Sequence, residues 1–296
     1  MAQDMAGDSI AINRRYLDHL VVEGRIVGAV HPDARFTMFG RTFDTPITTG
    51  ALSHLKAGMP ALAEGAKLAG AACCIGMGGT DELKAVLQTG ASVIKIIKPY
   101  ADRDEIYSRL ACAREQGAIA VGMDVEHAVN VYDDRDSLVA GYQMKLPTIA
   151  ELKEYVRDAG LPFLIKGAMS ARDAAACADI GCAGVILGHH NGLLRWAAPP
   201  ASLIPGIRKT VGHSLLIICD GGMQDGFDVF KALALGADAV SVGRPLMDPL
   251  NEKGPEGAAE VLRRMTDELK AMMVRTGFAK LSEIDASVLH EAPWLG

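Results

Sequence analysis

Residues 215–245 read LLIICDGGMQDGFDVFKALALGADAVSVGRP and contain one complete strand–helix–strand unit. The apolar runs at 215–218 and 239–242 predict two buried strands, and the apolar spacing of residues 227–235 predicts a helix between them. Gly236 follows that helix, and glycine readily adopts the left-handed conformation that ends a helix. Polar loops follow both strands, at Asp220-Gly221-Gly222 and at Gly243-Arg244. The stretch therefore predicts parallel strands whose carboxyl ends carry polar groups.

The same alternation of short apolar runs and helical segments recurs along the chain. Predicted strands lie at 46–49, 72–75, 93–97, 119–123, 162–165, 184–187, 215–218 and 239–242. Predicted helices lie at 57–69, 81–88, 102–115, 149–159, 171–180 and 227–235. Near-continuous apolar strands are typical of a parallel sheet covered on both faces. Eight such units favour a (β/α)₈ barrel, with an open doubly wound sheet as the alternative.

The segments outside these units predict an extension and a loop. Residues 1–44 precede the barrel, with a short amphipathic helix expected at 13–22 and a hairpin at 36–43 around Gly40-Arg41. Residues 45–296 are predicted to form one barrel domain, with its last helix at 255–275 and a tail on the surface. The polar loop at 125–148 follows the fourth strand and is expected to be either a cover over an active site, as long loops of barrels often are, or a simple excursion on the surface.

Composition excludes several classes of protein. The chain has 296 residues, a net charge of −6 and 5% aromatic residues, which makes nucleic acid an unsuitable partner. It lacks an apolar run of the roughly 20 residues that a membrane helix needs, and its start, MAQDMAGDSI, is unlike a signal peptide. Its six cysteines form no CxxC pair, so we expect reduced buried thiols in a cytoplasmic protein.

Residues that follow the predicted strands are the candidate functional residues, because barrel active sites lie at the carboxyl ends of the strands. Loops after the last two strands commonly bind phosphate, and glycines there leave backbone N–H groups accessible. We therefore expect a phosphate site at 220–222 and 243–244. The candidates in strand order are Gly50, Ala51, Lys98, Asp124, Lys166, His189, His190, Asp220, Gly221, Gly222, Gly243 and Arg244.

Four of these residues suggest acid–base chemistry. Lys166 ends an apolar strand, where a charge is costly unless it faces a polar mouth or pairs inside the barrel. His189 and His190 are adjacent, so we expect their side chains on opposite sides and only one of them in the site. Asp124 is expected either to orient that imidazole or to pair with a lysine. The spacing offers no third metal ligand, so no metal site is predicted.

Several of these segments resemble the FMN-dependent α-hydroxy-acid oxidase and dehydrogenase family, which includes glycolate and lactate oxidases. Residues 219–245 resemble the family's flavin-phosphate segment almost letter for letter, and residues 161–167 (LPFLIKG) resemble the strand whose lysine contacts the flavin ring. Asp124 and His189 fall where the family has an aspartate beside its catalytic histidine. The resemblance implies FMN held at its phosphate by residues 220–222 and 243–244, along its ring by Gly50 and Ala51, and near N1 and O2 by Lys166.

The resemblance also implies a reaction. His189 would take a proton from the hydroxyl of a small 2-hydroxy acid while hydride leaves for the flavin, and Asp124 would stabilise the imidazolium. Lys98 and Arg195 would bind the anionic end of the substrate. Family members are often tetramers, which implies a homo-oligomer here.

Three departures from the family pattern bear on the substrate. The pattern after the sixth strand is Asn-His-Gly-Gly-Arg, but this chain has Gly192 where the arginine clamps the substrate carboxylate. Lys98 stands where a tyrosine is usual, and Gln224 where the phosphate loop has an arginine. Two alternatives therefore stay open. One is an FMN-dependent isomerase similar to type 2 isopentenyl-diphosphate isomerases, and the other is a flavin- or phosphate-binding barrel with a decayed active site.

Overall fold

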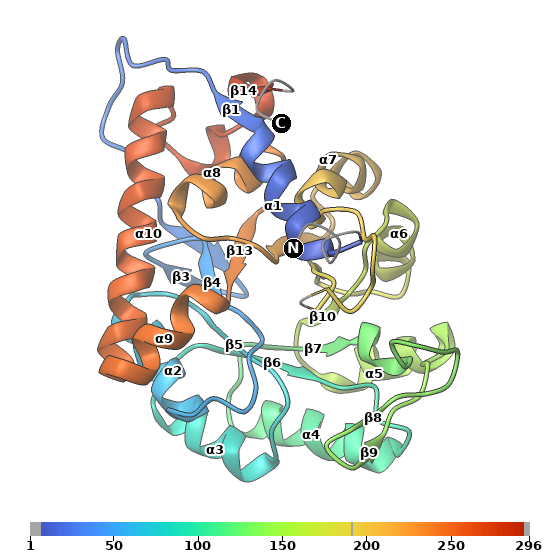
Figure 1. The fold of residues 1–296 in the computed structure, drawn as a ribbon. Helices are drawn as coiled ribbons and strands as arrows, with labels where there is room; N and C mark the ends of the chain where they lie inside the picture. Colours follow the sequence, from blue (N-terminus) through green and yellow to red (C-terminus); the bar gives the residue numbers. More distant parts are fainter. Residues whose placement is uncertain (1–6, 191, 293–296) are drawn as a thin grey trace, which may run out of the picture.

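The computed structural model describes residues 7–190 and 192–292 and forms a (β/α)₈ barrel (Figure 1). Its eight parallel strands have the order β4-β13-β12-β11-β10-β7-β6-β5, and bridges from Thr48 to Ala72 and from Leu52 to Ile75 join the two edges. The predicted barrel is thus confirmed over the open sheet. The strands are β4 (Ile47–Thr49), β5 (Cys73–Ile75), β6 (Val93–Ile97), β7 (Ala120–Asp124), β10 (Phe163–Lys166), β11 (Gly184–Leu187), β12 (Leu216–Asp220) and β13 (Ala239–Val242).

Helices cover the outside of the sheet, and most of them lie where the apolar spacing predicts them. The exceptions are α7 and α9, which the pattern did not single out, because Pro205 lies inside α7 and Pro249 lies inside α9. The helices after the barrel strands are α2 (Met59–Leu68), α3 (Thr80–Gln88), α4 (Arg103–Glu115), α5 (Ile149–Ala159), α6 (Ala171–Asp179), α7 (Pro200–Val211), α8 (Gly226–Ala234), α9 (Arg244–Lys253) and α10 (Pro255–Thr276).

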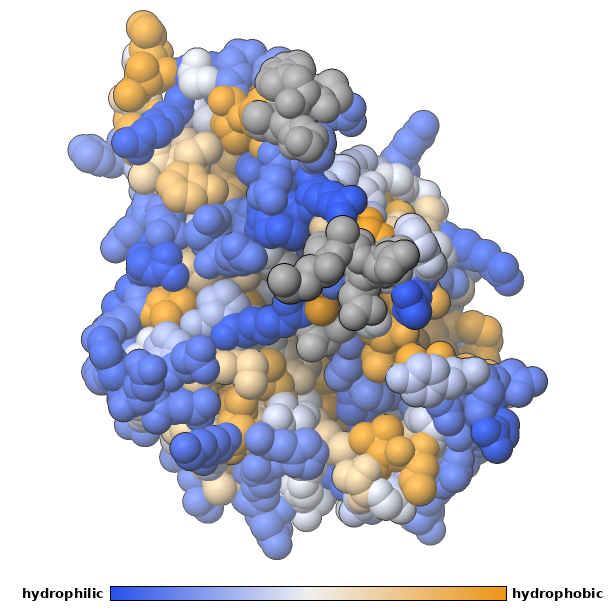
Figure 2. Space-filling model, in the orientation of Figure 1, coloured by the Kyte–Doolittle hydropathy of each residue, from blue (hydrophilic) through white to orange (hydrophobic). Residues whose placement is uncertain are grey.

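The core has two layers, because successive strand residues point to opposite faces of the sheet. In β6, Ile94 and Ile96 belong to the inner cluster inside the barrel, whereas Val93 and Ile97 belong to the outer cluster against the helices. Most of the outer surface in Figure 2 is hydrophilic, with hydrophobic side chains in separate groups. Both faces of the strands are therefore buried, as their near-continuous apolar sequences predict.

The N-terminal extension differs from its predicted form. Helix α1 is Ser9–His19 and is capped by Asp8, and residues 20–22, predicted as its end, form strand β1 (Leu20–Val22). Strand β1 pairs antiparallel with β14 (Leu289–Glu291), so this part of the tail joins a small sheet instead of lying on the surface alone (Figure 1). That pairing links segments far apart in sequence, which local spacing does not show.

Two further segments complete the fold. The hairpin of β2 (Phe36–Met38) and β3 (Arg41–Phe43) turns at Phe39 and Gly40, one residue earlier than predicted. The loop after β7 contains the short helix η1 (Val125–Ala128) and a small hairpin of β8 (Leu138–Val139) and β9 (Tyr142–Gln143). Of the helices in the described ranges, none is both long and apolar enough to cross a membrane.

Candidate active site

Four strands of the barrel bring a buried carboxylate and its cationic partners together at their carboxyl ends. Asp124 ends β7 and is 1% exposed. Its Oδ2 lies 2.9 Å from Nζ of Lys98, 3.3 Å from Nζ of Lys166 and 2.9 Å from Nδ1 of His190. Burial opposes ionisation of Asp124, but the two lysines and the histidine outweigh it and hold its pKa well below the usual range. Asp124 is therefore an anion that orients three groups.

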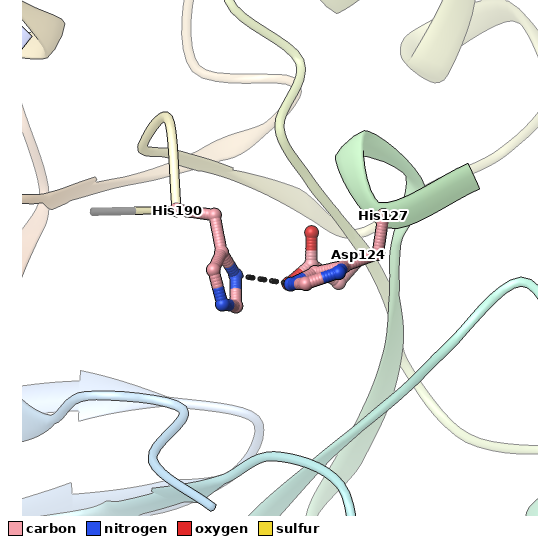
Figure 3. Close-up of side chains that lie close together, drawn as sticks. All are labelled: Asp124, His127 and His190. Atoms are coloured by element: carbon pink, nitrogen blue, oxygen red, sulfur yellow. Dashed lines mark hydrogen bonds and ion pairs between the residues drawn. The ribbon is translucent and has the colours of Figure 1, made fainter. Parts of the chain in front are cut away.

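The hydrogen bond to Asp124 decides which nitrogen of His190 carries a proton. Nδ1 lies 2.9 Å from the carboxylate, which accepts, and 3.3 Å from the ammonium group of Lys166, which donates. The closer contact with the carboxylate favours a proton on Nδ1. Burial is the largest influence on the pKa of His190 and lowers it, so the ring is neutral near pH 7. A neutral ring protonated at Nδ1 keeps a lone pair at Nε2, where it can accept a proton. Figure 3 shows the ring of His190 facing Asp124.

His189 lies outside this contact, so the predicted pairing of His189 with Asp124 is wrong. Its side chain is buried, its Nδ1 accepts the N–H of Gly192 at 3.1 Å, and its Nε2 has no partner in the described part of the chain. The φ of +36° at His190 departs from strand geometry, and its ring lies against Asp124 at the end of β7, whereas the charges that act on His189 include Asp220, Lys166 and Arg244. In this register Leu193, not Gly192, stands where the family pattern has its arginine.

Two residues that the sequence analysis did not single out lie beside this pair. His127 packs edge-to-face on His190, with ring centroids 3.9 Å apart at 87° (Figure 3), and burial lowers its pKa to about 3. Glu126 is half-buried, and burial raises its pKa to about 7. The sequence indicated a role for His127 and Glu126 only through their position, which directly follows Asp124 at the carboxyl end of a barrel strand.

The loops after β12 and β13 form a second cluster suited to a phosphate group. Gly221 and Gly222 have φ of +114° and +75°, which glycine adopts without strain. Their N–H groups, and that of Gly243, have no acceptor among the described residues, and Arg244 forms no ion pair with a carboxylate in the same part of the chain. Free N–H groups beside a cation form an anion site. The residues present therefore fit the phosphate of a nucleotide cofactor.

The remaining predicted cofactor residues connect the two clusters. A Cβ on Gly50 would lie 3.1 Å from Cα of Gly243, so the backbones of these two loops touch at the mouth, next to the half-buried Ala51. Lys166 reaches from Asp124 to Asp220, 3.9 Å from its Oδ2. Arg195 lies exposed on the loop after β11, and its role as a substrate anchor stays a prediction.

Comparison with known proteins identifies the family. The sequence profile of FMN-dependent dehydrogenases matches residues 3–146 and 132–291, which together cover most of the chain. The chain belongs to the FMN-dependent dehydrogenase family. Membership confirms FMN as the predicted cofactor, and it gives no support to the isomerase alternative.

Individual relatives of this chain are similar over different lengths. An L-lactate oxidase of Roseobacter sp. (strain GAI101) is 37% identical over 158 residues, which are 53% of this chain and 43% of that protein. An L-lactate oxidase of Lacticaseibacillus rhamnosus is 28% identical over 87% of this chain and 79% of its own length. A mandelate oxidase structure has the same fold, with a TM-score of 0.87 at 23% identity over 97% of this chain and 92% of that chain. The chain therefore spans less than half the length of the first of these relatives.

One arrangement at the barrel mouth offers a second chemical possibility. Asp124, His127 and His190 present ligand atoms within 4.8 Å of one another, a set that sequence spacing did not reveal. Two lysine ammonium groups, however, already share the Asp124 carboxylate. A divalent cation there would be repelled by both. The charges therefore favour proton transfer over metal binding at this cluster.

Proposed function

We propose that this protein oxidises a small 2-hydroxy acid, or a similar anionic alcohol, with FMN as the electron acceptor. The proposal rests mainly on the hydrogen bond between Asp124 and His190, because the same carboxylate also binds Lys98 and Lys166. This cluster lies at the same mouth of the barrel as the loops after β12 and β13, which are suited to a phosphate group. The names of its relatives, lactate and mandelate oxidases, support the same substrate class.

The cofactor residues divide into two groups. Gly221, Gly222, Gly243 and Arg244 would hold the FMN phosphate, and Gly50 and Ala51 would lie along the ring. Bound FMN supplies the two-electron acceptor of the oxidation. Lys166 would stabilise negative charge that develops on the ring, because Asp124 and Asp220 keep its buried amine protonated.

His190 is the proposed base in place of His189. Nε2 of His190 would accept the proton of the substrate hydroxyl, which makes the hydrogen on the adjacent carbon a better hydride donor. Asp124 would stabilise the imidazolium that results, through the hydrogen bond at Nδ1. The neutral ring of His127, packed against His190, would limit its rotation.

The substrate anion would be held differently from the family pattern. Leu193 offers no guanidinium, so the carboxylate of the substrate would be held by Lys98, assisted by Arg195. An ammonium group is a point charge without the two-pronged geometry of arginine. We therefore expect weaker discrimination among small anions than an arginine clamp gives.

Replacement of each of the two neighbouring histidines by alanine tests the assignment of His190 as the base. In His190→Ala we expect FMN to stay bound and reduction of the flavin by substrate to slow by about 10²-fold or more, because general base catalysis contributes that much. His189→Ala is the matched control and should retain most of the rate. Stopped-flow absorbance under anaerobic conditions measures both. Retained reduction in His190→Ala, or its loss only in His189→Ala, would contradict the assignment.

Two further properties remain expectations. We expect a homo-oligomer, a tetramer by the family resemblance, and a cytoplasmic location. Light scattering coupled to gel filtration tests the first, and cell fractionation tests the second.

A further inference from the structure

Helix α1 contacts both loops that carry the candidate site, although it lies outside the barrel. At its start, Oγ of Ser9 donates to the carbonyl of Leu194 and accepts the N–H of Ala197 at 2.9 Å, on the loop after β11. Its middle reaches Gly221 and Gly222, on the loop after β12. Figure 1 shows α1, in blue, lying between α7 and α8. The helix thus links the loop after β11, which contains His190, to the loop after β12, which is suited to a phosphate group.

Asn13 and Arg14 fix the direction of two peptide groups in that second loop. Nδ2 of Asn13, which is 1% exposed, donates to the carbonyl of Gly221 at 2.9 Å, and Nη1 of Arg14 donates to the carbonyl of Gly222 at 3.4 Å. In a trans peptide the C=O and the following N–H point in opposite directions. The N–H groups of Gly222 and Met223 therefore point away from α1, and neither has an acceptor in the described part of the chain.

The close approach of α1 also explains why residue 222 is glycine. A Cβ there would lie 2.0 Å from Nδ2 of Asn13, and the φ of +75° disfavours any side chain. Because residue 222 has no side chain, α1 can pack against this loop. The free N–H groups of Gly222 and Met223 remain on the side of the loop that faces away from α1.

Arg14 also changes the charge at this loop. Its guanidinium binds Asp228 through two nitrogens at 2.6 and 2.8 Å, and Asp228, 2% exposed, accepts the N–H of Gln224 at 3.0 Å. Without Arg14, the carboxylate of Asp228 would be an unpaired negative charge at the start of α8. Gln224 carries no charge, so it cannot supply the cation that the family pattern has at its position.

We propose that α1 completes the phosphate site, with Asn13 and Arg14 as positioning residues that direct the N–H groups of Gly222 and Met223 at the FMN phosphate. Arg14, from a distant helix, neutralises Asp228 and so removes a negative charge from a loop where Gln224 supplies no cation. This inference rests on the proposed placement of the FMN phosphate at this loop.

A comparison of FMN with riboflavin tests the inference, because riboflavin has the same ring system but no phosphate. Dissociation constants of both flavins for the flavin-free protein are measured by quenching of flavin fluorescence. In Asn13→Ala and Arg14→Ala we expect the FMN constant to rise about tenfold or more, as loss of roughly 1.4 kcal/mol would produce. The riboflavin constant should change less than about twofold. Arg15→Ala is the matched control, since this neighbouring arginine is exposed and should leave both constants unchanged.

The outcomes separate this inference from the proposed function. Equal weakening of FMN and riboflavin would show that α1 only supports the fold, and no weakening of either would also overturn the inference. If Arg14→Ala does not fold, Arg14→Lys keeps the charge but loses the paired geometry, and should still weaken FMN selectively. If Arg244→Ala weakens FMN selectively while the α1 variants do not, only this inference fails. If Arg244→Ala has no selective effect, the proposed phosphate site itself is wrong.

Discussion

Two lysines and a histidine share one carboxylate oxygen of Asp124. Asp124 therefore orients these three side chains and favours a proton on Nδ1 of His190. The sequence predicted that polar residues after the strands would converge there, because parallel strands end at the same edge. It could not decide between His189 and His190. That choice depends on the backbone turn at His190, whose positive φ has no signal in the residue type.

The stability of the protein should report the unusual ionisation of Glu126. Burial raises the pKa of Glu126 from 4.5 to about 7, so between these pH values the folded protein holds a proton that the unfolded chain has lost. Stability from this group is complete below pH 4.5 and is lost as pH rises to about 7, by at most about 3 kcal/mol. In Glu126→Gln this loss should be absent, so the variant gains relative stability above pH 7. Urea denaturation at pH 5 and pH 8 measures the difference, and an identical pH dependence in both proteins would refute it.

At the scale of elements, helix ends are where the sequence is most informative. Gly90, Gly117, Gly160, Gly181 and Gly236, which follow helices, all have positive φ, as expected from glycine at these positions. Strand β1 was mistaken for helix, because its pairing with β14 is a tertiary contact that overrides local spacing. Helix α7 was missed for the opposite reason, since Pro205 weakens a helical pattern that packing against the barrel sustains.

Helix α5 provides a test of local stabilisation. Oγ1 of Thr148 accepts the N–H of Glu151 at 3.2 Å, and Oε2 of Glu151 accepts the N–H of Thr148 at 2.8 Å, which together form a capping box. Thr148→Ala should lower the free energy of unfolding by about 1 kcal/mol. Thr148→Ser keeps the hydroxyl and should stay close to the original stability. Chemical denaturation compares the three proteins, and equal loss in both variants would argue against the cap.

At the scale of the whole molecule, the barrel closes where β4 meets β13 and β5, and the mouth depends on that closure. A Cβ on Gly50 would lie 3.1 Å from Cα of Gly243, so Gly50→Ala should force the two loops apart at a cost of about 1–3 kcal/mol. We also expect weaker FMN binding, since both loops are proposed to contact the cofactor. Gly206→Ala is the control, because a Cβ there meets nothing within 4 Å. Thermal unfolding and flavin fluorescence measure the two effects, and equal behaviour of the two variants would contradict the account.

Most of the barrel was predictable from the sequence, because each of its strands is a local apolar run with turn residues after it. The contacts that complete the site were less predictable. Asn13 and Arg14 meet Gly221 and Gly222 only after the chain has passed through seven further barrel strands. The sequence showed that the arginine of the family pattern is missing after the sixth strand. Whether Gly192 or Leu193 stands in its place depended on whether His189 or His190 is aligned with the family's histidine. Long-range placement, not composition, sets these features.

The absorption spectrum of the purified protein, recorded anaerobically before and after addition of a panel of 2-hydroxy acids, tests whether this protein oxidises such acids with FMN. We expect a flavin spectrum, restored by added FMN if it is weak, that at least one of these acids bleaches. A flavin spectrum that no 2-hydroxy acid bleaches would contradict the proposed reaction. Absence of flavin binding even with FMN added would contradict the proposed phosphate site as well.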